Sequence, residues 1–168
     1  GPGSTNLVTG IATAYMDSIP MVAITCNVGV SLLGKDSFQE IDIAGITIPI
    51  TKHNYIVKDV NDLADTVRQA FVIAKKGRPG PVLIDIPKDI QTATGPATYP
   101  SHVDIRGYKP CNSVHVGQLK KGYRLIKAAK KPLVLVGGGV NLARANKELQ
   151  AFVEKMERTY GGILSGDR

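Results

Sequence analysis

Apolar positions along the chain alternate between short continuous runs and helical spacing. Two apolar runs of strand length predict buried strands at 21–28 and 82–87. Residues 50–57 are also predicted to form a strand, although Lys52, His53 and Asn54 interrupt its apolar run. Apolar residues spaced three and four apart predict helices that begin near Leu7 and near Asp59, and Gly77 is predicted to end the second helix. Strands that alternate with helices in this way indicate a three-layer α/β/α fold with a parallel sheet.

A second α/β unit is predicted after a linker. Residues 88 to about 114 are rich in Pro, Gly, Thr and Ser and show no apolar period, as is typical of a linker. Beyond them the pattern predicts a helix over 116–130, a strand over 132–136 and a helix whose apolar face runs from Leu142 to Met156. With a single predicted strand, this unit is thinner than the first.

The chain opens on GPGSTNL, a glycine-rich turn that leads into a helix with Ser4 or Thr5 as its predicted N-cap. Such turns normally follow a buried strand, and none precedes this one. Two explanations are open: residues 1–4 are a remnant of tag removal, or the chain begins inside a domain. The fit between turn and helix favours the second, so we expect a piece of a larger α/β protein.

Composition places the chain among ordinary globular proteins, because 43% of its 168 residues are apolar and 21% are charged. No apolar stretch approaches the roughly 20 residues that span a bilayer, and no signal segment opens the chain, so a cytoplasmic location is expected. The net charge of +7 is concentrated between Arg106 and Lys131, where no acidic residue occurs. Aromatic residues for base stacking are not interleaved there, so a solvated helix face is favoured over a nucleic-acid site.

The segment GKDSFQE, residues 34–40, follows the first predicted strand, where open α/β sheets place ligands. Phe38 offers an apolar ring and Gln39 an amide that both donates and accepts, so the pair suits a small pocket. The alternative is that Phe38 anchors the loop and Gln39 caps backbone groups. His53 shows no carboxylate partner and is interpreted as structural or cofactor-facing rather than catalytic.

The remaining motifs are weaker. Glycines 137–139 lie between a predicted strand and a predicted helix, but Leu142 occupies the third glycine position of GxGxxG, so a tight turn and a cofactor site are both open. Cys26 and Cys111 have neither a zinc nor a redox spacing and are predicted to be reduced and structural. The sequence shows no P-loop, no nucleophile elbow and no metal-spaced cluster of ligands.

Four segments, in this order and with these separations, resemble the large catalytic subunit of acetolactate synthase, a thiamine-diphosphate enzyme. They are GPGSTNLVTGIATAYMDSIP, GKDSFQEIDIAGIT, ITKHNYIVKDV and GRPGPVLIDIPKDIQ. The resemblance covers roughly residues 1 to 153. FQE also occurs in relatives such as pyruvate oxidase, whereas its combination with ITKHN and GRPGPVLIDIPKD is more specific to acetolactate synthase.

The resemblance implies a subunit of three α/β domains. The first binds the aminopyrimidine of thiamine diphosphate, the middle one binds FAD, and the third binds the diphosphate of thiamine diphosphate through Mg²⁺. Residues 1–95 would be the second half of the pyrimidine-binding domain, 96–113 a linker, and 114–168 the beginning of the central FAD-binding domain. The implied reaction condenses pyruvate with pyruvate or 2-oxobutyrate, with loss of carbon dioxide, in branched-chain amino-acid biosynthesis. The implied partners are further copies of the subunit, in a homodimer or homotetramer, and a small regulatory subunit.

The resemblance also assigns site residues. Phe38 and Gln39 resemble the pocket residues beside the reacting part of the cofactor, and Asn27 and Val28 the segment next to that pocket. Lys52 resembles a lysine near the flavin and substrate channel. The implied flavin contacts are Arg106, Gly137, Gly138 and Gly139.

Two departures from the family pattern limit what the chain alone is expected to do. The glutamate that activates the aminopyrimidine and the GDG motif that binds the metal and diphosphate are both absent. The isolated chain is therefore expected to be inactive, with the Mg²⁺ ligands outside it. Residues 157–168, ERTYGGILSGDR, replace the apolar strand usual at this point. The alternative functions are a truncated, non-catalytic FAD-binding or subunit-interaction module and a fragment of a related thiamine-diphosphate enzyme such as pyruvate oxidase.

Overall fold

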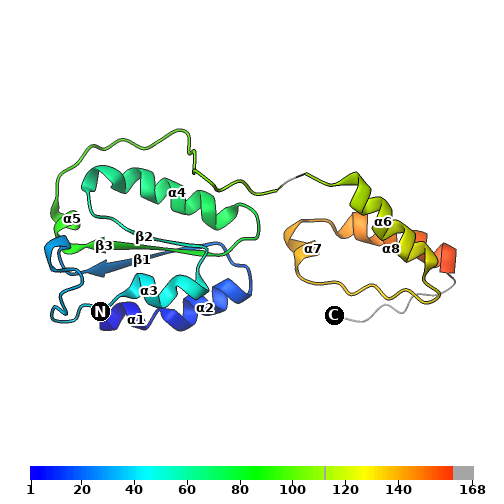
Figure 1. Ribbon diagram of the computed structural model, residues 1–168, viewed down its shortest axis with the longest axis horizontal. Coiled ribbons are helices and arrows are strands. Elements are labelled where there is room, and N and C mark those ends of the chain that lie inside the picture. The colour runs from blue at the N-terminus through cyan, green and yellow to red at the C-terminus, as the bar shows by residue number, and fades with distance from the viewer. Residues whose placement is uncertain (112, 161–168) are drawn as a thin grey trace. The chain divides into compact units, whose positions relative to one another are not determined.

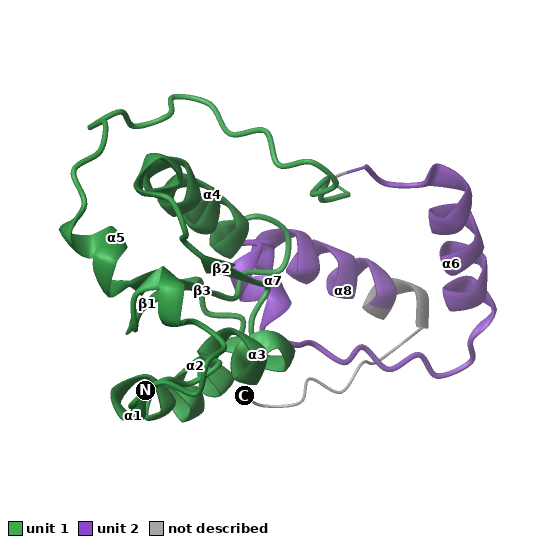
Figure 2. Ribbon diagram, turned by 60° about the vertical axis from the view of Figure 1, so that its left-hand side comes forward, with its two compact units in different colours: residues 1–111 green, residues 112–168 purple. Residues whose placement is uncertain are grey.

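A computed structural model describes the backbone of residues 1–111 and 113–160, with side chains to residue 156. The chain divides into two compact units, Gly1–Cys111 and Asn112–Arg168 (Figure 2). Most of the divergent segment ERTYGGILSGDR lies outside the described residues. No helix in the described part of the chain has both the length and the apolar character needed to span a bilayer.

Unit 1, residues 1–111, is built on a three-stranded sheet. The strands are β1 (Met21–Asn27), β2 (His53–Ile56) and β3 (Pro81–Pro87), in the order β1-β3-β2, and both pairs are parallel. Thr25 of β1 and Ile56 of β2 both pair with Asp85 of β3. The predicted α/β class with a parallel sheet is thereby confirmed.

Helices cover both faces of this sheet (Figure 1). On one face lies α4 (Leu63–Lys75), and on the other lie α1 (Pro2–Thr5), α2 (Val8–Met16) and α3 (Ile43–Thr47). Side chains alternate along β3, so Val82 and Ile84 pack in the cluster that contains α4 residues, whereas Leu83 packs with Ile11 of α2 and Ile43 of α3. All three β3 side chains are fully buried, and this strand is the centre of the core.

Several predicted element details are wrong, for local reasons. Residues 48–50 form a 3₁₀ turn (η2, Ile48–Ile50), so the second strand begins at His53 instead of Ile50. Ser4 and Thr5 lie inside α1 and cap nothing, and α2 starts after Leu7 without a side-chain cap.

The prediction that a helix follows Asp59 is confirmed at both ends. Asp59 accepts a hydrogen bond from the backbone N–H of Asn61 and caps the short turn η3 (Val60–Asp62), which leads into α4. Gly77 follows the helix with a φ of 63°, in the left-handed region that glycine adopts without strain. Among the apolar side chains of α4, Phe71 is 46% exposed, whereas Ala70 and Ile73 are buried.

The predicted linker is partly attached to unit 1. The 3₁₀ turn η1 (Val30–Leu32) follows β1, and the short helix α5 (Lys88–Thr92) follows β3. Residues 93–111 form no further helix or strand. Ile105 and Tyr108 nevertheless pack against the cluster beneath α4. The Tyr108 hydroxyl donates to the carbonyl of Lys76 at 2.8 Å, at the end of α4.

The described part of unit 2 contains three helices: α6 (Val116–Ala128), α7 (Gly139–Leu142) and α8 (Asn146–Tyr160). The predicted strand over 132–136 is wrong, because this stretch pairs with no other strand in the described residues, and strands are stabilised by pairing. Its side chains Leu133 and Leu135 are 80% and 94% exposed. Met156 is the one hydrophobic side chain that is buried among the described residues of this unit.

Candidate functional site

The loop of residues 34–40 lies beyond the carboxyl end of β1 and is closed by Glu40. The Glu40 carboxylate accepts hydrogen bonds from the backbone N–H groups of Gly34 and Ser37, the second at 2.9 Å. The Glu40 N–H donates to the Ser37 carbonyl at 2.9 Å. The carboxylate thus satisfies two amides that would otherwise lack partners inside the loop, and holds it as a compact turn.

Phe38 and Gln39 stand at the tip of this closed turn. Phe38 is 87% exposed, so it does not anchor the loop, and that alternative is contradicted. Gln39 is exposed and has a φ of 59°, which is uncommon for a residue other than glycine. The positive φ of Gln39 beside an exposed aromatic ring makes this turn the candidate binding surface of unit 1.

The opening turn of the chain meets this loop. A Cβ atom placed on Gly1 would overlap the carbonyl oxygen of Gln39, so only glycine allows the two backbones to come this close. The Ser4 N–H donates to the Gly1 carbonyl at 3.0 Å and begins α1. Two motifs that the sequence presents far apart, GPG and FQE, therefore share one edge of unit 1.

Asn27, the last residue of β1, has both ends of its amide engaged. Its Nδ2 donates to Asp85 Oδ2 at 2.7 Å and to the Ile41 carbonyl at 3.2 Å, while its Oδ1 accepts from the Val28 N–H at 2.9 Å. Asn27 and Asp85 line a cavity of about 310 Å³ together with Glu40 and Lys58. Asp85 was not singled out from the sequence; a lone carboxylate inside the apolar run VLIDIP was the available signal.

Lys52 lies at the opposite edge of the sheet. Its N–H donates to the carbonyl of Pro81, the first residue of β3, at 2.7 Å. Its Nζ donates to the carbonyls of Ile73 and Lys76 and to the Tyr108 hydroxyl, where it meets the negative end of the α4 dipole. The structure therefore does not bring Lys52 together with Asn27 and the Phe38–Gln39 pair.

The residues assigned to flavin fall in different units. Arg106 is exposed in unit 1, whereas glycines 137–139 lie in unit 2, at the start of α7. A Cβ atom on any of these three glycines would meet nothing within 4 Å, so the backbone of the turn is open to close approach. His53 is exposed and contacts the Tyr55 ring edge-on, with 4.5 Å between ring centroids.

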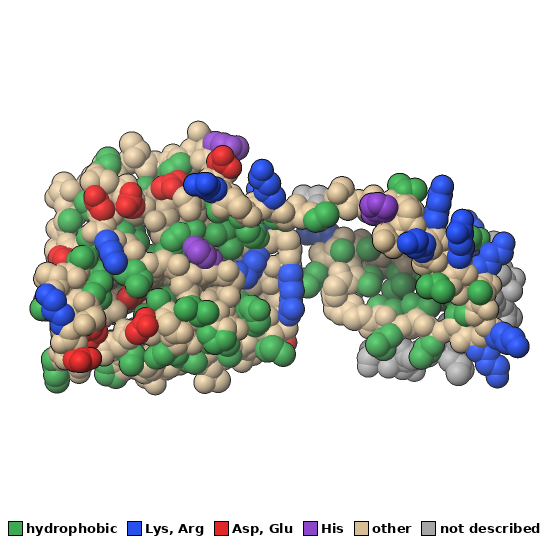
Figure 3. Space-filling view, in the orientation of Figure 1, with side chains coloured by type: hydrophobic (Ala, Val, Ile, Leu, Met, Phe, Trp, Pro, Cys, Tyr) green, Lys and Arg blue, Asp and Glu red, His purple; other side chains and the backbone are tan. Residues whose placement is uncertain are grey.

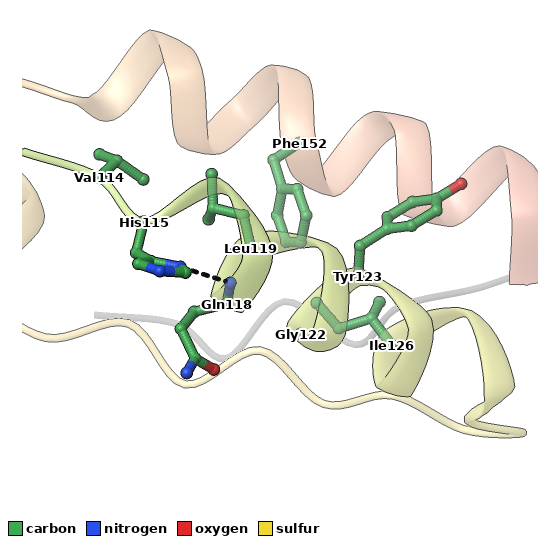
Figure 4. A pocket seen from close by; sticks show the side chains of 8 residues that line it. All are labelled: Val114, His115, Gln118, Leu119, Gly122, Tyr123, Ile126 and Phe152. Carbon is green, nitrogen blue, oxygen red and sulfur yellow. Dashed lines mark hydrogen bonds between the residues drawn. The ribbon is translucent and has the colours of Figure 1, made fainter.

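Unit 2 has an apolar groove of about 410 Å³ (Figure 4). Its lining comes from α6, from the residues just before it and from Phe152 of α8: Val114, His115, Gln118, Leu119, Gly122, Tyr123, Ile126 and Phe152. His115 caps α6 by accepting from the Gln118 N–H at 3.3 Å. None of the residues predicted to form a site lines this groove.

Basic side chains gather over unit 2 on the face shown in Figure 3. Those of α6 and the following turn are all exposed: Lys120, Lys121, Arg124, Lys127, Lys130 and Lys131. This arrangement agrees with a solvated helix face. Cys26 and Cys111 are both exposed, and the described residues hold no group of three or more His, Cys, Asp or Glu side chains arranged for a metal.

Comparison with known families defines the class of protein. Residues 1–46 match the thiamine pyrophosphate enzyme N-terminal TPP binding domain, and residues 119–160 match the thiamine pyrophosphate enzyme central domain. The chain thus matches two successive domains of the thiamine pyrophosphate enzymes.

Within that class the chain is similar to acetolactate synthase large subunits. It is 54% identical to that of Corynebacterium glutamicum over 92% of the chain, and 45% identical to that of Haemophilus influenzae over 99%. It is 46% identical to the isozyme 3 large subunit of Escherichia coli over 93%. These relatives confirm the resemblance predicted from the motifs. The matched segments make up 25%, 29% and 28% of the three relatives, so the chain spans about a quarter of their length.

Glu40 is expected to make the loop sensitive to pH. Hydrogen bonds from the Gly34 and Ser37 amides lower the pKa of Glu40 below its usual value. A pKa that is lower in the folded state stabilises the loop above about pH 4.3, and this stabilisation is lost as the pH falls through the lowered pKa. Amide exchange of Gly34 and Ser37, followed by NMR, should show falling protection in acid.

The matched control is Glu40→Gln, which cannot titrate. Its loop should be less protected than that of the native chain at neutral pH and should show no such loss in acid. Equal pH dependence of protection in both proteins would contradict the role given to the Glu40 carboxylate.

Proposed function

We propose that this chain forms part of an acetolactate synthase large subunit, which condenses pyruvate with a second pyruvate or with 2-oxobutyrate and releases carbon dioxide. The observation that carries the proposal is identity of 45% to 54% to such subunits over at least nine-tenths of the chain. The exposed Phe38–Gln39 pair, closed against the GPG turn at one edge of unit 1, supports it.

The residues at this edge fit an organic cofactor and a small acid. Thiamine diphosphate, when bound, would act as the electron sink for decarboxylation of a 2-oxo acid. The Phe38 ring would exclude water from the reacting atoms, and the Gln39 amide would donate to a carboxylate or carbonyl oxygen of the substrate. Asn27 would position the segment that begins at Val28, because both ends of its amide are already engaged within the protein.

The remaining assignments extend the same proposal. Glycines 137–139 of unit 2 would hold the diphosphate of FAD through their accessible backbone amides. Arg106 of unit 1 is proposed separately as a flavin contact, because a guanidinium suits a diphosphate. Lys52 is better explained as a cap of α4, because its ammonium already donates to two carbonyls and a hydroxyl. Mg²⁺ would be bound by residues outside this chain, in a cytoplasmic enzyme that assembles from several copies of the subunit, with a small regulatory subunit as a further partner.

The test compares two proteins: a subunit of the relatives' length that carries this sequence, and the 168-residue chain alone. With thiamine diphosphate, Mg²⁺ and FAD, the longer subunit should form acetolactate from pyruvate, and the short chain should form none above background. Failure of the longer subunit with both pyruvate and 2-oxobutyrate would overturn the proposal.

The alternative function has its own readout. Circular dichroism should show a thermal transition of the 168-residue chain that FAD does not shift, because the described part of unit 2 has a single buried hydrophobic side chain. A sharp transition raised by FAD alone would favour a self-standing flavin-binding module instead.

A further inference from the structure

A buried polar cluster lies under the candidate site, at the carboxyl end of the sheet. Asp85 of β3 is 1% exposed, and Thr25, its partner in β1, is 3% exposed. The Thr25 hydroxyl donates to Asp85 Oδ1 at 2.7 Å, and Asn27 Nδ2 donates to Asp85 Oδ2 at 2.7 Å. Both oxygens of the buried Asp85 carboxyl group thus accept a hydrogen bond from a side chain of β1, the neighbouring strand.

This cluster reaches the Phe38–Gln39 loop through Asn27. The same Nδ2 that donates to Asp85 also donates to the carbonyl of Ile41, which directly follows Glu40. Nδ2 carries two protons, so Asp85 and Ile41 use both of them and leave the amide a single orientation. The base of the loop is therefore tied to the centre of the sheet by a relay from Asp85 through Asn27 to Ile41.

Burial of the Asp85 carboxyl group destabilises the folded state. Removing it from water carries a desolvation penalty, and no basic side chain among the described residues hydrogen-bonds to it. An apolar side chain would fit the rest of the run VLIDIP, in which Val82, Leu83 and Ile84 are fully buried. Fully satisfied buried networks of this kind fix one local geometry, which a purely apolar contact does not.

We propose that Asp85 is a positioning residue, which fixes the Asn27 amide and through it the base of the loop that carries Phe38 and Gln39. The proposal rests on the proposed function in one respect, namely that this loop contacts substrate. It assigns no chemical step to Asp85, which is buried below the loop.

Three variants of the acetolactate-forming subunit separate positioning from simple stability. Asp85→Ala removes both hydrogen bonds, Thr25→Val removes only the bond that does not lead to the loop, and Asp85→Asn is the conservative rescue. In the rescue variant, Oδ1 can accept from Asn27 while Nδ2 donates to the Thr25 hydroxyl, so every partner stays satisfied.

Asp85→Ala is expected to raise KM for pyruvate and to lower kcat/KM about 100-fold, as misplaced contact residues do. Thr25→Val and Asp85→Asn should keep the native KM. Loss of folded protein lowers only the amount of active enzyme and leaves KM unchanged, so KM distinguishes the two roles. A native KM in Asp85→Ala, or an equal rise in Thr25→Val, would overturn the proposal.

Amide exchange over residues 34–42 gives a second readout that does not need activity. Exchange should be faster in Asp85→Ala than in Thr25→Val. If Asp85→Ala does not fold, the double variant Asn27→Asp/Asp85→Asn takes its place. It keeps the hydrogen bonds of residue 85 to residue 27 and to Thr25, but residue 27 can no longer donate to the Ile41 carbonyl. This double variant should fold and still show fast exchange in the loop, and native exchange would overturn the relay. If the native subunit forms no acetolactate, the proposed function fails, while the exchange comparison still decides the role of Asp85.

Discussion

Replacing Leu83 by alanine is expected to destabilise unit 1 by about 3 kcal/mol, within the usual range for a fully buried leucine. Leu83 is 0% exposed in the central strand and packs between Ile11 and Ile43. Domains are stable by only about 5 to 15 kcal/mol, so this loss is a large share of the total. Urea unfolding of the 168-residue chain, followed by circular dichroism, measures it as a lower midpoint.

The matched control is Leu32→Ala in η1, where the side chain is 48% exposed. This variant removes the same atoms from a site that is open to solvent and should cost well under half as much. Equal midpoints for the two variants would show that β3 is not the centre of the core.

Gly1→Ala is expected to lower kcat/KM of the acetolactate-forming subunit about tenfold. The added methyl group overlaps the Gln39 carbonyl oxygen, so either the GPG turn or the Phe38–Gln39 loop must shift. Overpacking of this kind costs about 1 to 3 kcal/mol of folding stability. A contact residue that is displaced from its position stabilises the transition state less, which lowers the rate. Steady-state kinetics with pyruvate measure the change.

Gly3→Ala is the control within the same turn. A Cβ atom there meets nothing within 4 Å, so the variant should keep native kinetics. Equal loss of activity in both variants would mean that the turn acts through its flexibility and not through its contact with Gln39.

The first and third strands of unit 1 could be predicted because each is a continuous apolar run. The start of the second strand could not, because Pro49 and the Thr51 hydroxyl, which donates to the Thr47 carbonyl at 2.7 Å, continue helical turns through residue 50. The strand over 132–136 was mispredicted for another reason. Its apolar pattern indicates which side chains the stretch could bury. A strand also needs a neighbouring strand to pair with, and the pattern does not identify one.

The candidate site shows the same division. Phe38 and Gln39 are predicted from residue type and from their place after a strand, and the structure places them in the exposed loop beyond β1. The roles of Glu40 and Asp85 could not be predicted, because each acts through hydrogen bonds to groups that only the fold brings near it. The position of Lys52 could not be predicted either, since it lies just before β2 begins, whereas Asn27 lies where β1 ends.

The extended stretch of residues 132–136 has a practical consequence for handling the chain. Leu133, Leu135 and Val136 are exposed on a segment that pairs with no strand among the described residues. Unpaired apolar segments of this kind recruit one another edge to edge. The isolated chain is therefore expected to associate through residues 132–136, and a charged substitution at Leu135 is expected to reduce that association.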